Sequence, residues 1–336
     1  MREIPADHGD AAAEYAAVRQ SVGLIDRSDW GVIEVTGRDR QSFLHAMLSN
    51  DIKALEPGQG CAAAMLDVHG KVQTFATVLA LDDRLLVVTP PGRAAALMET
   101  LDRYLFSEKA ALRDATGELD FVLAAGPESL AMVTRLSGAT VPTTPWHHVM
   151  APLGGVDSRA VRGDGETGEA EVWLVSPTAH AEPPRSTLIG AGAKPVGRTA
   201  YESLRIETGT AVVGLDADES VLLPEVPSFE RRVSYTKGCY LGQEVVVRIR
   251  DRGHVNRLMR GLIVDGDRVP ARGARVLVGD ADIGQVTSAT WSFGLKRPIA
   301  LAFVRRQHAE PGTAVRIVPG DGASAAATVS ALPLSR

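Results

Sequence analysis

Cysteine is scarce in this chain of 336 residues, and its scarcity excludes several classes of protein. The two cysteines, Cys61 and Cys239, lie far apart in the sequence. They provide neither the framework of a disulfide-rich secreted domain nor the closely spaced pairs of a structural zinc or cluster site. We therefore expect a protein of the reducing cytoplasm, with no metal site of its own.

The chain also lacks an excess of positive charge, a long apolar run and the common nucleotide-binding motifs. Its formal net charge is −5, which gives no general reason to expect nucleic-acid binding. No uncharged apolar stretch reaches the length of a membrane span, and the acidic residues Asp7, Asp10 and Glu14 argue against a signal peptide. No Walker A pattern is present. We expect no membrane or nucleic-acid partner, and the length suggests two or three domains.

Lysine is rare as well, with six residues among the 36 basic ones, and one of the six begins the most unusual stretch of the chain. Residues 237–244 read Lys-Gly-Cys-Tyr-Leu-Gly-Gln-Glu. The thiol of Cys239 lies between two glycines, which allow unusual backbone angles or a close approach. The amine of Lys237 would favour a thiolate. This pattern indicates a functional site, although a buried structural cysteine in a tight turn is the alternative.

These eight residues, followed by Val245-Val246-Val247-Arg248, resemble the signature of the YgfZ family. The members are folate-binding proteins related to the glycine-cleavage T-protein (aminomethyltransferase) and linked to iron–sulfur cluster assembly or repair. The resemblance implies tetrahydrofolate or another reduced folate as cofactor, and Cys239 and Lys237 as the reactive pair. It further implies that Gly238 and Gly242 shape the backbone of the motif. Tyr240, Gln243 and Glu244 are the folate-binding residues that it implies here.

A second stretch carries the same resemblance. Residues 204–209, Leu-Arg-Ile-Glu-Thr-Gly, match the L-R-x-E-x-G helix of the T-protein relatives, in which the carboxylate hydrogen-bonds the pterin ring. The resemblance therefore implies Glu207 and Arg205 as folate-binding residues. The N–H and amino edge of a pterin suits a bidentate carboxylate. The alternative for Glu207 is a solvated residue near the end of a helix.

The order of predicted strands and helices shows no strict β–α–β alternation, which favours an α+β fold. The resemblance implies a T-protein-like cloverleaf: an N-terminal α+β module over residues 1–115, and a second α+β module with the folate helix and cysteine motif over 116–252. Residues 253–336 follow as a C-terminal antiparallel β-barrel. The sequence supports this barrel independently, because six short apolar strands between 258 and 332 are separated by Gly, Pro and Asp turns.

Several local patterns make further predictions. Asp39 is a candidate N-cap, and Thr199 with Glu202 forms a capping box at the start of the folate helix. The β-branched run 245–249 favours a strand by propensity, whereas the resemblance places a helix there that begins near Gly242. That helix would put Cys239 at its N-terminus, where a thiol pKa is lowered. In the least informative region, 138–198, the run 163–166 predicts a surface loop, and His147-His148 favours a polar turn over metal ligands.

Three functions remain open from the sequence. The first is a tetrahydrofolate-binding factor for iron–sulfur proteins, in which Glu207 anchors the pterin and Cys239 and Lys237 face the cavity or its mouth. Its candidate partners are folate and iron–sulfur client or assembly proteins. The second is a true aminomethyltransferase. T-proteins carry an Asp-Asp pair for that chemistry, but the matching positions here are Thr74 and Phe75, so the catalytic carboxylate is missing. The third is a folate-binding scaffold without chemistry.

Overall fold

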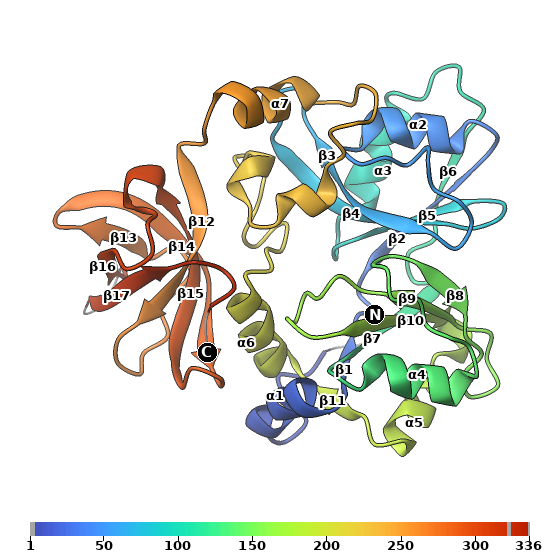
Figure 1. The fold of residues 1–336 in the computed structure, drawn as a ribbon, viewed down its shortest axis with the longest axis horizontal. Helices are drawn as coiled ribbons and strands as arrows, with labels where there is room; N and C mark the ends of the chain where they lie inside the picture. The colour runs from blue at the N-terminus through green and yellow to red at the C-terminus, as the bar shows by residue number, and fades with distance from the viewer. Residues whose placement is uncertain (1–3, 321–323, 335–336) are drawn as a thin grey trace.

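The computed structural model describes residues 4–320 and 324–334, which form two mixed sheets and a closed barrel (Figure 1). The five-stranded sheet has the order β3-β4-β5-β2-β6, and the six-stranded sheet has the order β11-β1-β7-β10-β9-β8. All pairings are antiparallel except that of β1 with β11. The predicted α+β class is confirmed.

Helices α2 (Arg40–Met47) and α3 (Ala94–Asp102) cover the outer face of the five-stranded sheet. Strands β4 and β5 are buried along almost their whole length, because this sheet is covered on both faces. That coverage explains why the β5 sequence is a continuous apolar run and does not alternate. The strands are β2 (Gly31–Thr36), β3 (Gly60–Leu66), β4 (Val72–Ala80), β5 (Leu85–Thr89) and β6 (Ala111–Asp114).

Helices α4 (Ser129–Ser137) and α5 (Glu182–Gly190) cover the outer face of the six-stranded sheet. Strand β1, which lies in the predicted first module, pairs with β7 and β11 of this sheet. The sheets are thus not contiguous in sequence, and the module boundaries 1–115, 116–252 and 253–336 stay a prediction. The strands are β1 (Gly23–Asp26), β7 (Leu119–Ala125), β8 (His148–Met150), β9 (Arg159–Arg162), β10 (Glu171–Pro177) and β11 (Lys194–Val196).

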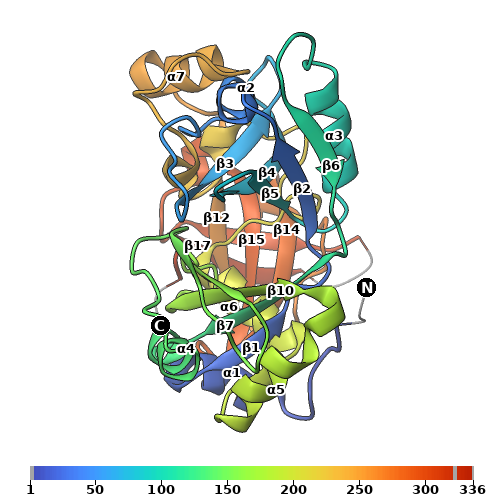
Figure 2. The same cartoon turned by 90° about the vertical axis from the view of Figure 1, so that its right-hand side faces the viewer.

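The inner faces of the two sheets share one apolar core. It joins side chains of the five-stranded sheet, such as Val32 and Leu79, to Ile25, Phe121 and Trp173 of the six-stranded sheet. In Figure 2 the two sheets lie one above the other, with the barrel behind them. The protein is therefore a helix–sheet–sheet–helix stack with a barrel beside it.

The barrel has a separate core of its own, filled by aliphatic side chains such as Leu262, Val276 and Val304. Helix α6 (Arg198–Thr208) packs against its strand β14 (Figure 1). The six predicted barrel strands are confirmed as β12 (Arg257–Val264), β13 (Arg275–Val278), β14 (Ala281–Ser292), β15 (Arg297–Arg305), β16 (Ala314–Val318) and β17 (Ala325–Ser330). The remaining elements are α1 (Ala11–Gln20), α7 (Gln243–Arg252) and the 3-10 helices η1 (Thr178–His180), η2 (Leu223–Glu225), η3 (Phe229–Arg232) and η4 (Arg306–His308).

The local predictions had mixed outcomes. The run 245–249 is helical, so the resemblance was right and the strand propensity wrong. The capping box was wrong: α6 begins at Arg198 after Gly197, and the Glu202 carboxylate instead accepts a hydrogen bond from Arg205. Asp39 occupies the N-cap position of α2 without capping it, because its carboxylate accepts a hydrogen bond from the backbone N–H of Lys109. None of the helices in 4–320 and 324–334 is long and apolar enough to cross a bilayer.

Candidate functional site

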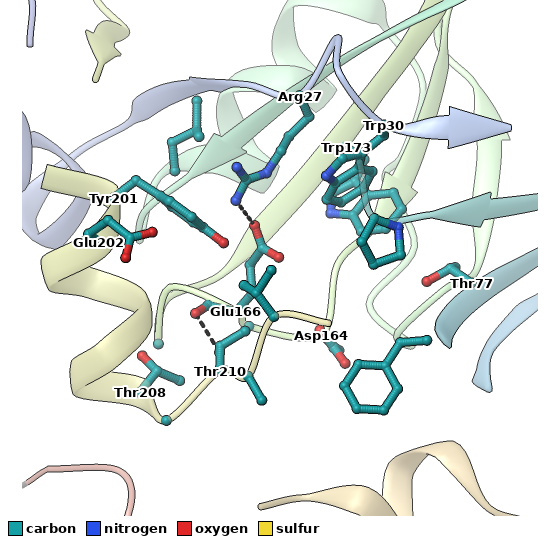
Figure 3. A pocket seen from close by; sticks show the side chains of 18 of the residues that line it. Arg27, Trp30, Thr77, Asp164, Glu166, Trp173, Tyr201, Glu202, Thr208 and Thr210 are labelled. Atoms are coloured by element: carbon teal, nitrogen blue, oxygen red, sulfur yellow. Dashed lines mark hydrogen bonds and ion pairs between the residues drawn. The ribbon is translucent and has the colours of Figure 1, made fainter. Parts of the chain in front are cut away.

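A cavity of about 860 Å³ lies between the inner faces of the two sheets and α6. Its wall combines residues of β4 and β5 with residues of β1 and β10, the loop 162–170 and the segment 207–232 (Figure 3). Its lining combines apolar and aromatic side chains with many charged ones, and its size is typical of a site for a small organic ligand.

Tryptophan side chains form one wall of the cavity. The chain has four tryptophans, and Trp30, Trp146 and Trp173 all line this cavity. The centre of the Trp173 ring lies 4.3 Å from the centre of the Trp30 ring and 4.8 Å from that of the Trp146 ring, and both pairs have edge-to-face geometry. Trp146 has a φ of 66°, which is rare for a bulky residue and is held by its backbone hydrogen bond to Arg162. Strain of this kind concentrates at functional sites.

The loop 163–169 forms another wall, and a single buried carboxylate holds it. Glu171 on β10 accepts hydrogen bonds from the backbone N–H groups of Gly165, Glu166 and Thr167 and from the Thr167 hydroxyl, at 2.6–3.1 Å. The fully buried Glu171 thereby fixes the backbone of the loop. The sequence predicted a surface loop at 163–166, and the segment is a loop, but it is not openly exposed: Gly163 is buried, and Asp164, Gly165 and Glu166 are partly buried and line the cavity.

An ion pair crosses the cavity wall between β1 and the loop. The Arg27 guanidinium donates to the Glu166 carboxylate at 2.6 Å and lies 3.8 Å from the centre of the Tyr201 ring. Burial alone would lower the pKa of Arg27, but the Glu166 carboxylate raises it above the ordinary value, so the arginine stays charged. Thr210 donates to the Glu166 backbone carbonyl, and both contacts are visible in Figure 3.

Glu207 lines the cavity from α6, but its carboxylate is fully engaged. One oxygen accepts hydrogen bonds from Tyr15 and Arg19, each at 2.7 Å, and the other accepts from Ser203 at 3.1 Å and Ser292 at 2.5 Å. These four donors occupy about all the lone-pair positions of a carboxylate. Glu207 is thus buried and not a solvated helix residue, and its contact with a pterin stays a prediction.

Lys237 points away from the cavity, toward the C-terminal end of α2. Its ammonium donates to the backbone carbonyls of His45, of Leu48 at 2.6 Å and of Asn50 at 3.1 Å. The carbonyls of His45 and Leu48 are among those that the end of a helix leaves without partners, and Asn50 follows in the next turn of the chain. Burial lowers the pKa of Lys237 to about 8, so the amine is mostly protonated at neutral pH and its three N–H groups match three acceptors.

Cys239 is exposed and is not among the residues that line the cavity. It lies in a loop four positions before Gln243, the first residue of α7, and not in the helix itself. Gly242 has a φ of 79°, and a Cβ there would come within 2.4 Å of the Asp67 carbonyl, so this motif position requires glycine. A Cβ at Gly238 would meet only the His45 imidazole, at 3.9 Å.

The other predicted site residues are also dispersed. Tyr240 is buried, and its hydroxyl has no hydrogen-bond partner among the described residues. Gln243 and Glu244 lie on the first turn of α7, where Glu244 pairs with Arg248 at the surface. Arg205 is fully buried in a network with Asp216 and lies behind the cavity wall. Of the predicted side chains, only Glu207 lines the cavity.

The sequence did not single out most of the residues that line the cavity, because they come from distant segments. Examples are Arg27 directly after β1, Asp164 and Glu166 in the loop, and Arg232 on η3. One signal was available: tryptophan is rare in the chain, and three of its four copies line this cavity.

Comparison with known proteins gives matches over nearly the whole chain. Residues 5–227 match the GCVT N-terminal domain, and residues 257–335 match the glycine cleavage T-protein C-terminal barrel domain. An aminomethyltransferase of Streptomyces avermitilis is 31% identical over 343 residues, which covers 99% of this chain and 92% of that protein. A putative chloroplastic transferase of Arabidopsis thaliana is 26% identical over 313 residues, 93% of this chain and 71% of its own length.

A solved structure has the same fold. The crystal structure of the glycine cleavage system aminomethyltransferase T from Bartonella henselae matches with a TM-score of 0.84 at 24% identity, covering 98% of this chain and 91% of that one. The predicted cloverleaf of two mixed modules and a C-terminal barrel is thereby confirmed.

Proposed function

The chain belongs to the glycine-cleavage T-protein family, and from this premise we propose that it is a YgfZ-type tetrahydrofolate-binding factor that supports iron–sulfur cluster assembly or repair. Members of the T-protein family generally bind tetrahydrofolate. The finer assignment depends on the Lys-Gly-Cys-Tyr-Leu-Gly-Gln-Glu motif. The observation that carries it is the exposed thiol of Cys239 within this motif, on a chain that also has a ligand-sized cavity.

The residues of the cavity fit a reduced folate. Trp30, Trp146 and Trp173 offer aromatic surface to a pterin or aminobenzoyl ring. Charged groups of the wall, such as Asp164 and Arg232, and the Thr77 hydroxyl offer donors and acceptors to the polar atoms of a folate. A bound tetrahydrofolate would supply the nitrogen atoms that carry one-carbon units.

The position of Cys239 favours a role toward a protein partner. Its side chain is exposed at the surface and does not line the cavity, so another macromolecule can reach the thiol while folate occupies the interior. Client or assembly proteins of the iron–sulfur pathway are the partners that the motif implies. A single cysteine does not hold a cluster by itself, so the thiol would serve as a nucleophile or as one transient ligand.

Aminomethyl transfer is the second candidate, because the Streptomyces avermitilis relative is named an aminomethyltransferase. The residues at the positions of the T-protein carboxylate pair oppose it. Thr74 and Phe75 are both buried, and the Thr74 hydroxyl hydrogen-bonds the Phe75 carbonyl at 3.1 Å. Neither side chain exchanges a proton at neutral pH, so the acid–base step would need another group.

Two measurements test the proposal. Titration of the protein with tetrahydrofolate in a calorimeter should show saturable binding, and the absence of binding would exclude the folate function. A strain that lacks its YgfZ-type protein should regain the activity of a cluster-dependent enzyme with the wild-type chain but not with Cys239→Ala. Cys61→Ala is the matched control, since Cys61 packs in the apolar cluster beneath α2.

Each alternative has its own outcome. Full rescue by Cys239→Ala together with folate binding would favour the non-catalytic scaffold. Aminomethyl transfer in a reconstituted glycine-cleavage assay would favour the transferase, and the proton-exchanging group would then have to come from the cavity wall.

A further inference from the structure

Two oppositely charged side chains in the cavity wall are candidates for ligand binding. Asp164 in the loop 163–169 and Arg232 on η3 both line the cavity. Neither side chain makes a hydrogen bond or ion pair with another residue of 4–320 or 324–334, and in Figure 3 no dashed line reaches Asp164. The Arg232 guanidinium lies over the Phe75 ring at 4.4 Å. Both side chains are partly buried, and a charge that is partly removed from water without an ion-pair partner is costly, so the arrangement favours a polar ligand.

From this arrangement we infer that Asp164 and Arg232 together bind the polar edge of the pterin ring. The inference rests on the proposed folate function. A pterin presents an amino group, a ring N–H and a carbonyl oxygen side by side along one edge. A carboxylate accepts from the first two in a bidentate, charge-assisted pair, and a neighbouring guanidinium donates to the third.

The surrounding contacts hold the two charges near each other. The Arg231 guanidinium donates to the Asp164 backbone carbonyl at 2.9 Å, which ties η3 to the loop. Glu171 fixes the backbone of the next residues, Gly165 and Glu166. Burial raises the pKa of Asp164 and lowers the pKa of Arg232. The Arg232 charge partly offsets the rise for Asp164, and the Asp164 charge partly offsets the fall for Arg232. Such a preformed donor–acceptor pair reduces the entropy cost of ligand binding.

The other carboxylates of the wall are less suitable. Glu207 already accepts four hydrogen bonds, so a pterin would have to displace Tyr15, Arg19 or a serine. Glu166 is paired with Arg27. Asp29 has an oxygen without a hydrogen-bond partner among the described residues, but that atom is sealed from solvent. The arginine that interacts with Asp29, Arg27, forms its hydrogen bond with Glu166. Asp164 differs from these three carboxylates because the cation beside it, Arg232, forms no ion pair with an acidic side chain of the described residues.

The test is calorimetric titration of the full chain and of point variants with three probes: tetrahydrofolate, tetrahydropterin without the tail, and p-aminobenzoylglutamate. Asp164→Asn and Arg232→Met should each weaken tetrahydrofolate and tetrahydropterin binding about 10- to 100-fold, the range expected for one charge-assisted hydrogen-bonding group. Affinity for the tail fragment should be unchanged. Asp102→Asn, at an exposed residue of α3 that does not line the cavity, is the matched control and should bind within about threefold of the wild type.

A second readout separates recognition from folding. Because neither side chain makes a hydrogen bond or ion pair with another described residue, its replacement should leave the thermal stability of the ligand-free protein nearly unchanged. Lower stability of Asp164→Asn or Arg232→Met would instead assign them a structural role and overturn the inference.

The inference and the proposed function fail in different ways. If the wild-type chain binds neither tetrahydrofolate nor tetrahydropterin, the folate function itself is wrong. If the wild-type chain binds both but the Asp164 and Arg232 variants bind equally well, only the pterin contacts are wrong. If Glu207→Gln loses most of its affinity for tetrahydropterin and Asp164→Asn loses none, Glu207 and not Asp164 is the carboxylate that binds the pterin. Guanosine offers the same edge, so guanosine binding with no tetrahydropterin binding would assign the pair to a purine.

Discussion

At the scale of single residues, Lys237 and Cys239 show how one motif serves two purposes. The two positions are separated by one glycine, yet the Lys237 side chain is buried against three backbone carbonyls and Cys239 is exposed. The lysine holds the motif against the end of α2, and this contact fixes where the cysteine is displayed. Lys237 therefore positions the motif, and its role in a reactive pair with Cys239 stays a prediction.

Lys237→Met tests this division. The substitution leaves the carbonyls of His45, Leu48 and Asn50 without their donor, so the free energy of unfolding should fall by about 1–3 kcal/mol. Denaturant unfolding measures the change, and Lys53→Met, at an exposed lysine, is the control. Unchanged stability combined with lost complementation would instead support a chemical role for the Lys237 amine.

His148 predicts a pH dependence of stability. The Arg159 guanidinium can only donate, so its 2.8 Å contact to His148 Nδ1 requires that this nitrogen carries no proton. Burial, with Arg159, lowers the pKa of His148 to about 4. Since the unfolded state has the ordinary value near 6.5, it binds more protons between these pH values, and stability is lost as the pH falls below about 6.5.

The matched variant is His148→Asn, which keeps an acceptor for Arg159 but does not titrate. The stability advantage of the wild type over this variant should shrink by about 2 kcal/mol between pH 7.5 and pH 5. Denaturant midpoints of both proteins at the two pH values measure it. Parallel pH profiles would mean that His148 is not the titrating group.

At the scale of elements, α6 connects the barrel to the two-sheet stack through a buried polar network. The Arg205 guanidinium donates to the Asp216 carboxylate at 3.0 Å and to the Ser288 hydroxyl of β14 at 2.9 Å. The other Asp216 oxygen accepts from Thr287 and Ser288. On the same helix, Glu207 accepts from Ser292, also on β14. These contacts give the Leu-Arg-Ile-Glu stretch a structural role in addition to the folate contact that the resemblance implied.

Arg205→Met tests that purpose. Removal of one partner of a fully buried ion pair leaves Asp216 uncompensated, so the free energy of unfolding should fall by about 3–5 kcal/mol. The double variant Arg205→Met/Asp216→Leu should recover part of this loss, because it removes both charges. Intact stability with lost tetrahydrofolate affinity would instead support the folate-binding role that the resemblance implied for Arg205.

The elements also show where sequence reasoning works. Strands β12–β17 were predictable because apolar runs and turn residues are local signals. Helix α7 was not predictable from its β-branched residues. The residue before it, Gly242, has a left-handed backbone and packs against the Asp67 carbonyl, a contact between distant segments that local propensity does not reveal. The loop 163–169 appeared featureless, since its order comes from Glu171, a charged residue whose burial the sequence does not reveal.

At the scale of the whole molecule, the site could be predicted only in part because the two sheets exchange segments. Strand β1 joins the six-stranded sheet, while the segment with η3 returns to the five-stranded sheet, where Ser234 hydrogen-bonds the Ser49 carbonyl. Arg27, Asp164 and Arg232 meet through this exchange although more than a hundred residues separate the first two in the sequence. The resemblance located Glu207 at the cavity, but only the fold brings the other charges to it.

This arrangement leads to a prediction for the whole protein: folate should stabilise both sheets together. The cavity wall contains Thr77 of β4, Trp173 of β10, Tyr201 of α6 and Leu334 near the end of the chain. A ligand that binds only the folded state stabilises it by about 2.7 kcal/mol at a concentration one hundred times its Kd. Saturating tetrahydrofolate should therefore raise the denaturant midpoint, and the increase should follow the logarithm of its concentration.

Hydrogen exchange locates the effect. Amides of β4, β10 and the loop 163–169 should exchange more slowly with tetrahydrofolate bound, because local opening of any of them would break the ligand site. Strands β13 and β16 lie in the barrel, and none of their residues lines the cavity, so their exchange by local opening should not change. Protection limited to one sheet would mean that the ligand binds a surface of that sheet and not the cavity between the two. Protection of β13 and β16 alone would place the folate site on the barrel.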